Sequence, residues 1–460
     1  MEFRNLTPFH ALAFSALDID DREYRVIAMK VAYRVVAVDD RRFVAVVVDD
    51  EPYPLCMADQ YTGKVGESSV REESDLAPHK PRCDVVVRGN AYAPHGVPAE
   101  RWPVRIRVSI PASPPEMDVE RPLPLSPGMA LNESQREDWE RIKQEAKQKH
   151  AEASRWQPVL DKALAISGPR YFARDILTLW RGWRLTSPEP ASNVNVGWER
   201  AFGGRSVVEN PDHETGSDAP AYLINEVCFS NPLGCGWMHH GDLESRKRAG
   251  QSIPERLSAP QIETVDGIDR LHVARHPAGE LTARMMTQVA GKYGAKPAGF
   301  GFIGRAWAPR LPLAGTYDDA WLEKRWPYLP KDFDFGYWNG APVDQQTPYL
   351  PPDARIELWN LTSPERTPTG YMQVDLPGHR PFVLLRFENG YMLPFRMVLD
   401  TLIVDTDALL LIATYRIRVP VDAPIRVVEA RYETDPSAPL VQVPEQETDR
   451  DEQEIIRHGG

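Results

Sequence analysis

Proline content is the feature that most constrains what this chain can fold into. The sequence has 43 prolines among 460 residues, about 9% against roughly 5% in an average protein. They are scattered along the whole chain, singly and in pairs such as Pro114-Pro115 and Pro351-Pro352. Because proline breaks helix interiors and central strands, we expect many short elements joined by ordered loops, and an all-helical architecture is disfavoured.

Hydrophobic patterning predicts strands at both ends of the chain. From Arg25 the sequence "RVIAMKVAYRVVAVDDRRFVAVVVDD" places two β-branched runs around an acidic turn, which is typical of a hairpin. Residues 101–110 alternate apolar and polar side chains, as a half-buried strand does. Residues 395–421 also place two β-branched runs around an acidic turn, Asp405-Thr406-Asp407, and the two segments share this turn chemistry rather than a sequence repeat. The predicted fold class is therefore mainly β (α+β), with two β-rich halves in a sandwich or barrel-like arrangement and long ordered loops rich in proline and aromatic residues.

A proline-rich joint and a charged helix separate the two halves. The predicted division is residues 1–110 for the N-terminal half, 111–167 for the joint and helical insertion, 168–432 for the C-terminal half, and 433–460 for an acidic disordered tail. The helix, over residues 131–156, has only a thin apolar stripe and is expected on the surface. Further helices are expected at residues 279–293 and 318–325.

Charge and hydropathy narrow the classes of partner. The formal net charge is −12, and the chain has no long run of lysine and arginine, which disfavours nucleic acid as the main partner. There is no secretory signal pattern and no run of 18 apolar residues, so membrane insertion is not expected. Four cysteines in a chain of this length give no disulfide framework. We therefore expect a cytoplasmic protein.

Two local patterns suggest metal or nucleotide chemistry, and neither has the required context. Cys228 and Cys235 are too far apart for a zinc ligand pair, so "NPLGCGW" is interpreted as a tight turn. The segment "GFGFIG" from Gly299 satisfies the dinucleotide pattern, but no strand precedes it and Pro309 blocks a following helix. We interpret these glycines as a kinked segment against which aromatic rings pack closely. No metal and no cofactor are predicted.

The segment "GTYDDAWLEKRWPYLPKDFDFGYWNGAPVDQQ" (residues 315–346) is the strongest candidate for a functional site. Asp332, Asp334 and Asp344 could act as acid/base groups or metal ligands, but the spacing of a calcium loop is absent. Aspartates in such loops more often cap backbone amides and fix turns. The three tryptophans, three tyrosines and two phenylalanines either fill a core or anchor an interface.

An ordered set of motifs makes the chain recognisable. "HKPRCDVVVRGNAYAP", "WERAFGG", "NPLGCGW", "GFGFIGRAWAPR", the segment above and "LDTLIVDTD" together resemble a domain-of-unknown-function family of Gram-negative bacteria, from about Arg4 to Tyr415. Genes of that family commonly lie beside type VI secretion spike and effector genes. The resemblance implies a non-enzymatic cytoplasmic adaptor or chaperone. Such a protein would bind an effector through its PAAR-like domain and help to load it onto the VgrG spike.

The resemblance carries over no catalytic residue, and it marks the aromatic segment as a family signature. The expected partner-binding or signature residues are Trp321, Trp326, Asp332, Asp334, Trp338, Asn339, Asp344 and Gln345. Whether they contact cargo or hold the scaffold together stays open at this stage. Two alternatives also remain: a hydrolase that uses the three aspartates, and a structural component of the secretion apparatus.

Overall fold

The structure is a computed structural model. It describes residues 1–65, 68–112, 133–134, 136–142, 144, 156–173, 184–203, 205–209, 222–227, 231, 233–236, 250, 256–265, 298–307 and 309–441. Of the charged helix expected over residues 131–156, the described residues between 133 and 144 are helical, whereas Trp156 begins a strand. The helix expected at residues 279–293, the cysteine and histidines at 228, 239 and 240, and the acidic tail beyond residue 441 lie outside these ranges.

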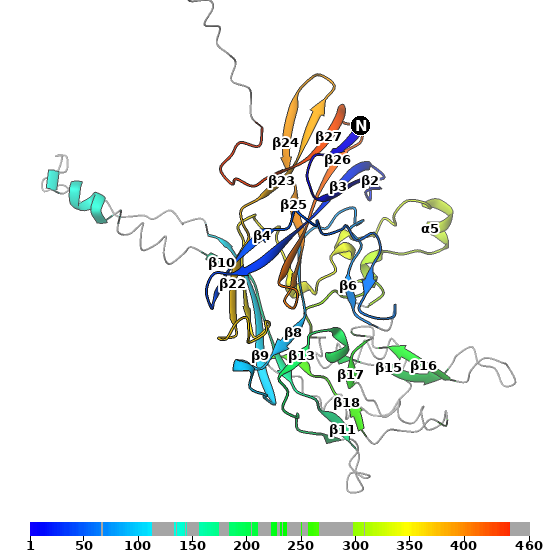
Figure 1. The fold of residues 1–460 in the computed structure, drawn as a ribbon. Coiled ribbons are helices and arrows are strands. Elements are labelled where there is room, and N and C mark those ends of the chain that lie inside the picture. Colours follow the sequence, from blue (N-terminus) through cyan, green and yellow to red (C-terminus); the bar gives the residue numbers. More distant parts are fainter. Residues whose placement is uncertain are drawn as a thin grey trace, which may run out of the picture.

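A curled, half-barrel sheet dominates the fold (Figure 1). Its strand order is β19 (Ile262–Thr264), β10 (Trp156–Ser167), β9 (Arg101–Pro111), β21 (Arg355–Trp359), β22 (Tyr371–Asp375), β4 (Arg42–Val47), β3 (Glu23–Ala37), β26 (Leu410–Pro420), β25 (Val398–Asp405), β7 (Cys83–Arg88) and β20 (Gln346–Thr347). β2 (His10–Leu17) also pairs with β3. Most neighbours are antiparallel, while β25 with β7 and β22 with β4 are parallel. The mainly β prediction is confirmed.

A second sheet of four strands lies at one end of the body, at the top in Figure 1. Its order is β1 (Glu2–Asn5), β27 (Ile425–Glu433), β23 (Arg380–Phe387) and β24 (Met392–Arg396). The remaining strands form small sheets: β11 (Tyr171–Ala173) with β12 (Arg184–Leu185) and β18 (Arg256–Ser258), β8 (Asn90–Tyr92) with β13 (Asn193–Asn195), β14 (Phe202–Gly203) with β17 (Cys235–Gly236), β15 (Arg205–Glu209) with β16 (Tyr222–Val227), and β5 (Gln60–Tyr61) with β6 (Val70–Glu72).

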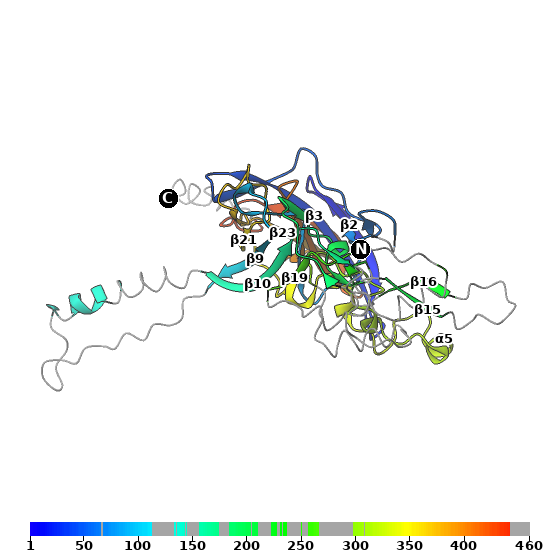
Figure 2. The ribbon, with the colours of Figure 1, turned by 90° about the horizontal axis from the view of Figure 1, so that it is seen from below.

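Helical structure among the described residues is short. The elements are α5 (Asp319–Lys324) and the 3₁₀ turns η1 (Pro94–Gly96), η2 (Trp198–Arg200), η3 (Leu311–Ala314), η4 (Phe335–Trp338) and η5 (Val343–Gln345). α5 confirms the helix predicted at residues 318–325, and the Asp318 carboxylate caps it by accepting from the Trp321 N–H at 2.8 Å. In Figures 1 and 2, α5 lies on the opposite side of the body from β9 and β10.

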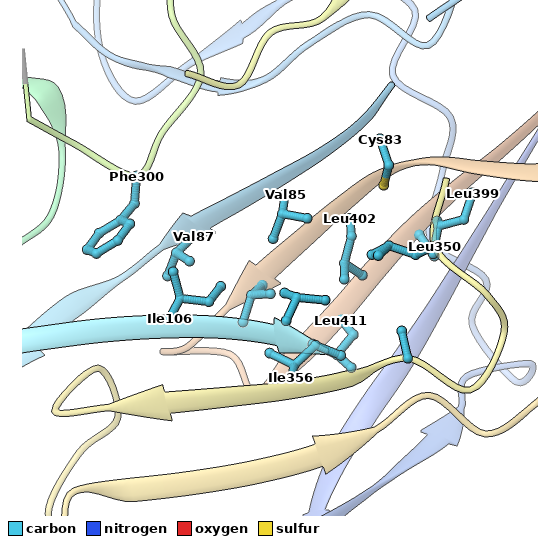
Figure 3. Packing of buried hydrophobic residues seen from close by; sticks show 14 of the residues in the cluster. Cys83, Val85, Val87, Ile106, Phe300, Leu350, Ile356, Leu399, Leu402 and Leu411 are labelled. Atoms are coloured by element: carbon cyan, nitrogen blue, oxygen red, sulfur yellow. The ribbon is translucent and has the colours of Figure 1, made fainter. Parts of the chain in front are cut away.

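Period-two patterning explains the core. Alternate residues of β3, among them Met29 and Tyr33, point into the main apolar cluster, where they meet side chains of β7, β9, β21, β25 and β26. Figure 3 shows this convergence: Val85 and Leu402 lie side by side on the neighbouring strands β7 and β25, and Ile106 of β9 belongs to the same apolar cluster. Because side chains alternate between faces, every second residue of these strands lies on the other face, which is also buried along much of β3, β7, β25 and β26 but not along β9 and β21.

The two predicted hairpins form, and strands from both halves of the chain enter one sheet. β3 and β4 turn at Asp39, whose carboxylate accepts from the Arg41 and Arg42 amides, and β25 and β26 turn just after Asp405. Trp156–Ser167, within the range predicted as insertion, is a full partner of β9. The alternation of apolar and polar residues predicts where an individual strand lies, but it does not predict which strands from distant parts of the chain pair with each other.

The glycines of "GFGFIG" allow close packing of aromatic rings, as interpreted from the sequence. Trp198 is almost completely buried and lies edge-to-face with Trp307, with 5.6 Å between ring centroids. A Cβ on Gly299 would lie 2.7 Å from Trp198 Cζ3, and one on Gly301 would lie 3.2 Å from Trp198 Nε1. The glycines are therefore required by ring packing rather than by a bound phosphate.

We expect Gly299→Ala to lower the free energy of unfolding by about 1–3 kcal/mol, because the added methyl group overpacks against the Trp198 ring. Gly301→Ala is the matched control and should cost less, since its methyl group would lie 3.2 Å from the Trp198 ring rather than 2.7 Å, so a shift of a few tenths of an ångström relieves the contact. Urea unfolding followed by tryptophan fluorescence measures both. Equal stability of the two variants would contradict this packing explanation.

Candidate functional site

A layer of loops covers the second face of β3, β7, β25 and β26. Val70, Phe302 and Ala341 come from these loops and pack against Ala32 and Ile403 of the sheet in a small second apolar cluster. The sheet also places charged side chains under the loops, and all of them are buried. These are Lys30, Asp84, Asp400 and Arg416. Buried charges require paired partners, so the loops must supply or complete the ion pairs.

Lys30, on β3, illustrates how the loop layer neutralises the sheet. Its ammonium group lies 2.5 Å from both the Glu72 and the Asp75 carboxylates. Burial alone would lower the pKa of Lys30, but the carboxylates of Asp75 and Glu72 outweigh it, and the pKa is raised. Arg416, on β26, pairs with Asp400 at 2.5 Å. These pairs bring opposite charges together within the buried layer.

Asp84, on β7, is the point where the signature segment joins this layer. Its carboxylate accepts from Lys80 Nζ at 2.8 Å, from Asn339 Nδ2 at 3.0 Å, and from the Gly340 and Ala341 amides at 2.9 and 3.2 Å. A side chain at position 340 would collide with the Glu73 carboxylate, so glycine is required there. The turn Asn339–Ala341 is therefore shaped around one buried carboxylate.

Gln345 makes a second anchor, between two distant strands of the sheet. Its Oε1 accepts from Lys162 Nζ of β10 at 2.8 Å, and its Nε2 donates to the carbonyls of Val85 in β7 and Phe300 at 2.7 and 2.9 Å. Lys162 also donates to the Gly299 carbonyl and to Asp344. Burial lowers the pKa of Lys162, and Asp344 only partly opposes this. We call this group of contacts the clasp.

The predicted signature residues separate into a buried and an exposed group. Asn339 and Gln345 are at most 1% exposed and are structural, and Trp321 and Trp338 are half-buried. Exposed are Trp326, Asp332, Asp334 and Asp344. Trp338 packs under the guanidinium of Arg305, 5.1 Å from its ring centre. The structure therefore does not gather the eight residues into one site.

The three aspartates have structural partners. Asp332 accepts from the Thr316 hydroxyl and amide, which lowers its pKa, and Asp334 accepts from the Gly336 amide. Both line an open hollow that also includes His79, and Asp344 is not among its lining residues. A carboxyl group with a lowered pKa is a poor proton donor at neutral pH. Asp332 and Asp334 accept from backbone amides, in agreement with the expectation for such loops, whereas Asp344 pairs with Lys162.

Sequence reasoning missed the buried charged residues that hold the loop layer and the signature segment on the sheet: Lys30, Lys80, Asp84 and Lys162. A usable signal existed, because a lysine within "VIAMKVAY" or an aspartate before "VVV" stands in a run whose neighbours are buried. Such a residue must find a partner of opposite charge. The pattern does not say which one, since Glu72 is 42 residues from Lys30.

One family matches this chain over most of its length. The family described as "Uncharacterized protein conserved in bacteria (DUF2169)" matches residues 20–113 and 147–416, which include the clasp and the whole signature segment. The chain belongs to this family. The unmatched residues 114–146 fall within the expected insertion. No curated protein and no solved structure gives a significant match.

Metal-ligand clusters and membrane-spanning helices are two further features of interest. Within the described ranges, no group of three or more histidine, cysteine, aspartate or glutamate side chains is arranged to hold a metal ion. No helix in the described part of the chain is long and apolar enough to cross a lipid bilayer.

Replacing Asp84 with asparagine should lower the free energy of unfolding by about 3–5 kcal/mol, because Lys80 would be left as a buried charge without its carboxylate. Asp334→Asn is the matched control. Its side-chain oxygen can still cap the Gly336 amide on the exposed surface, so the cost should stay below about 1 kcal/mol. Chemical denaturation measures both, and equal costs would refute the anchoring role of Asp84.

His79 gives the fold a pH dependence. Burial, followed by the charge of Arg418, lowers the pKa of His79 to about 4, and its ring lies edge-to-face with Phe335. Between this pKa and the unfolded value near 6.5, the unfolded chain binds a proton that the folded chain does not, so stability is lost as the pH falls through this window. His79→Asn should reduce the loss of melting temperature between about pH 7 and pH 5. His10→Asn, at an exposed position on β2, is the control and should follow the wild type.

Proposed function

We propose that this protein is a non-enzymatic adaptor or chaperone that binds a type VI secretion effector, through its PAAR-like region, and helps to load it onto the VgrG spike in the cytoplasm. The motif resemblance described above motivates the choice of partner. One structural observation carries the proposal of a binding role: an exposed cluster of aromatic and aliphatic side chains on a stiffly held projection. We call residues 311–328 the aromatic projection.

The aromatic projection exposes side chains that seldom face water in such number. Trp326 is 65% exposed, Leu322 59%, Tyr317 53%, Leu311 48% and Tyr328 40%. Tryptophan and tyrosine dominate binding energy at protein interfaces, and contiguous exposed apolar groups mark interaction sites. In Figure 1 the helix α5 stands out from the body, so a partner can reach these side chains.

Local contacts hold the aromatic projection in one conformation. Trp321 lies edge-to-face with Tyr317 and donates from Nε1 to the Tyr328 carbonyl at 2.9 Å. Arg325 makes two bonds of 2.7 Å to Asp21, next to the hairpin of β2 and β3. A surface that is ordered before binding loses less conformational entropy when the partner docks. This stiffness supports a role in recognition.

The charges around the aromatic projection indicate what kind of partner fits. Asp318, Asp319 and Glu323 are exposed on or beside α5, against the single exposed cation Lys324, since Arg325 is held by Asp21. An acidic rim around an apolar centre complements a partner surface with an apolar centre and a lysine- or arginine-rich rim. We therefore propose that the effector presents such a basic surface.

The test is co-expression of the full-length chain with the product of the neighbouring effector-type gene, followed by size-exclusion chromatography with light scattering. A defined complex is expected, and Trp326→Ala together with Leu322→Ala should weaken it by about tenfold or more. Tyr391→Ala removes an equally exposed ring, 74% exposed, on the four-stranded sheet and is the matched control.

Each alternative predicts a different result. Failure to bind a folded effector would overturn the adaptor proposal. If the double variant still forms the complex, the binding surface lies outside the aromatic projection. Stoichiometric assembly with the spike in the absence of effector would favour a structural component. Turnover abolished by Asp332→Asn with Asp334→Asn would favour the hydrolase.

A further inference from the structure

A large groove, separate from the aromatic projection, lies where the main sheet meets the four-stranded sheet. Its volume is about 1060 Å³, which is at the upper end of the range for ligand pockets. Ends of β4, β9, β10 and β22 form one wall, and the starts and ends of β23 and β24 form the other. Proteins place binding sites preferentially at such junctions.

The groove has an apolar part that faces solvent. Phe43 and Leu376 are buried at its floor, while Val38 is 58% and Val44 45% exposed at its rim. Exposed valines in a concave surface provide contact area for apolar side chains of a ligand. The groove is therefore suited to an extended segment with some apolar side chains rather than to a compact charged molecule.

Two arginines with unused bonding capacity line the same groove. Arg396 lies opposite Phe382 across β24 and β23, and Arg380 is two residues before Phe382, so both side chains lie on one face. Arg380 is only 8% exposed, and its buried Nε has no hydrogen-bond partner among the described residues. This Nε is out of contact with solvent, so a ligand in the groove can bond to the guanidinium only through its terminal nitrogens.

The other charges of the groove are largely neutralised. Arg42 bonds Asp39 at 2.7 Å, and Asp375 makes two bonds of 2.7 Å to Arg355. Of the charged lining residues, Arg380, Arg396 and Asp353 remain. The two guanidinium groups therefore leave a positive excess in the groove, and planar guanidinium groups bind carboxylates in a bidentate manner.

From this we infer that the groove binds an extended acidic segment of a partner protein. Its carboxylates would accept from Arg380 and Arg396, and its apolar side chains would pack on Phe43, Val44 and Leu376. The surface has the opposite charge to the aromatic projection, so this inference goes beyond the adaptor proposal and does not rest on it.

Recognition must occur through side chains rather than by adding a strand to β24. In the pairing of β23 and β24, Phe387 donates to the Tyr391 carbonyl and Met397 to the Pro381 carbonyl. The alternation of an antiparallel ladder then leaves position 394 with its nitrogen facing the open edge. Proline at that position removes the central donor, which prevents strand addition there.

The described C-terminal residues leave the groove open to another chain. Pro436 lines the groove, and Arg380 holds the carbonyls of Asp435 and Ala438. Residues 439–441 line a different hollow, beside Arg386 and Arg431. The chain therefore leads away from Arg396 before its own acidic run, residues 445–454, begins. A partner is the occupant that this geometry favours.

The test uses the full-length protein and a fluorescein-labelled peptide of eight alternating glutamate and leucine residues, followed by fluorescence anisotropy. Saturable binding is expected, weakened about tenfold by Arg396→Gln and reduced by high salt. Val44→Ser should also weaken it, which tests the apolar part. Arg4→Gln removes an exposed guanidinium on β1, the opposite edge strand of the four-stranded sheet, and should change the affinity by less than about twofold.

Three results would overturn the inference. One is equal binding of a peptide with glutamine in place of glutamate, and another is unchanged affinity in Arg396→Gln. The third concerns the source of the carboxylates. In a full-length variant, the six acidic residues of the run 445–454 are replaced by amides. If this variant binds the peptide and the wild type does not, the chain's own run occupies the groove.

Discussion

The fold depends on how the two ends of the curled sheet are held together, and one buried amide does this. Gln345 uses its oxygen on Lys162 of β10 and its nitrogen on the carbonyls of Val85 and Phe300, so both ends of the side chain are satisfied. Val87 in turn donates to the Phe300 carbonyl, which fixes the intervening segment on β7. Without the amide, the buried ammonium of Lys162 would keep only the Gly299 carbonyl and a carboxylate that is largely in water.

The same stretch of chain that closes the sheet also presents the aromatic projection, and the two tasks are separated along it. Several hydrogen bonds to the Asp84 carboxylate fix the position of Asn339 and of the backbone amides that follow it. The hydrogen bonds of the clasp fix the position of Gln345. The residues before them, from Tyr317 to Tyr328, face solvent and are held by local contacts and by Arg325. Substitutions in the projection can therefore alter a binding surface without breaking the buried network, whereas substitutions near Asp84 cannot.

Local periodicity predicted those features that depend on a few neighbouring residues. It predicted the hairpin of β3 and β4, the strand β9 and the short helix α5, because the side-chain periodicity of strands and helices is encoded within a few positions. It did not predict the clasp, since Gln345 and Lys162 are 183 residues apart. It also did not separate Asn339 and Gln345 from the exposed signature residues. The polarity of a side chain such as asparagine or glutamine suggests a surface position. Only its hydrogen-bond partners, which are distant in the sequence, show that the side chain is buried with its hydrogen bonds made.

Two surfaces of opposite character have consequences for how partners would be held. The aromatic projection has an acidic rim, and the groove has a positive excess from Arg380 and Arg396 that Asp353 only partly offsets. A partner patch that complements one surface places like charges against the other, which disfavours binding in the wrong place. If both proposals hold, a basic and an acidic partner segment can therefore be bound at the same time without competing. An adaptor has to bridge two components, and charge of opposite sign on a stiff scaffold gives each component its own site.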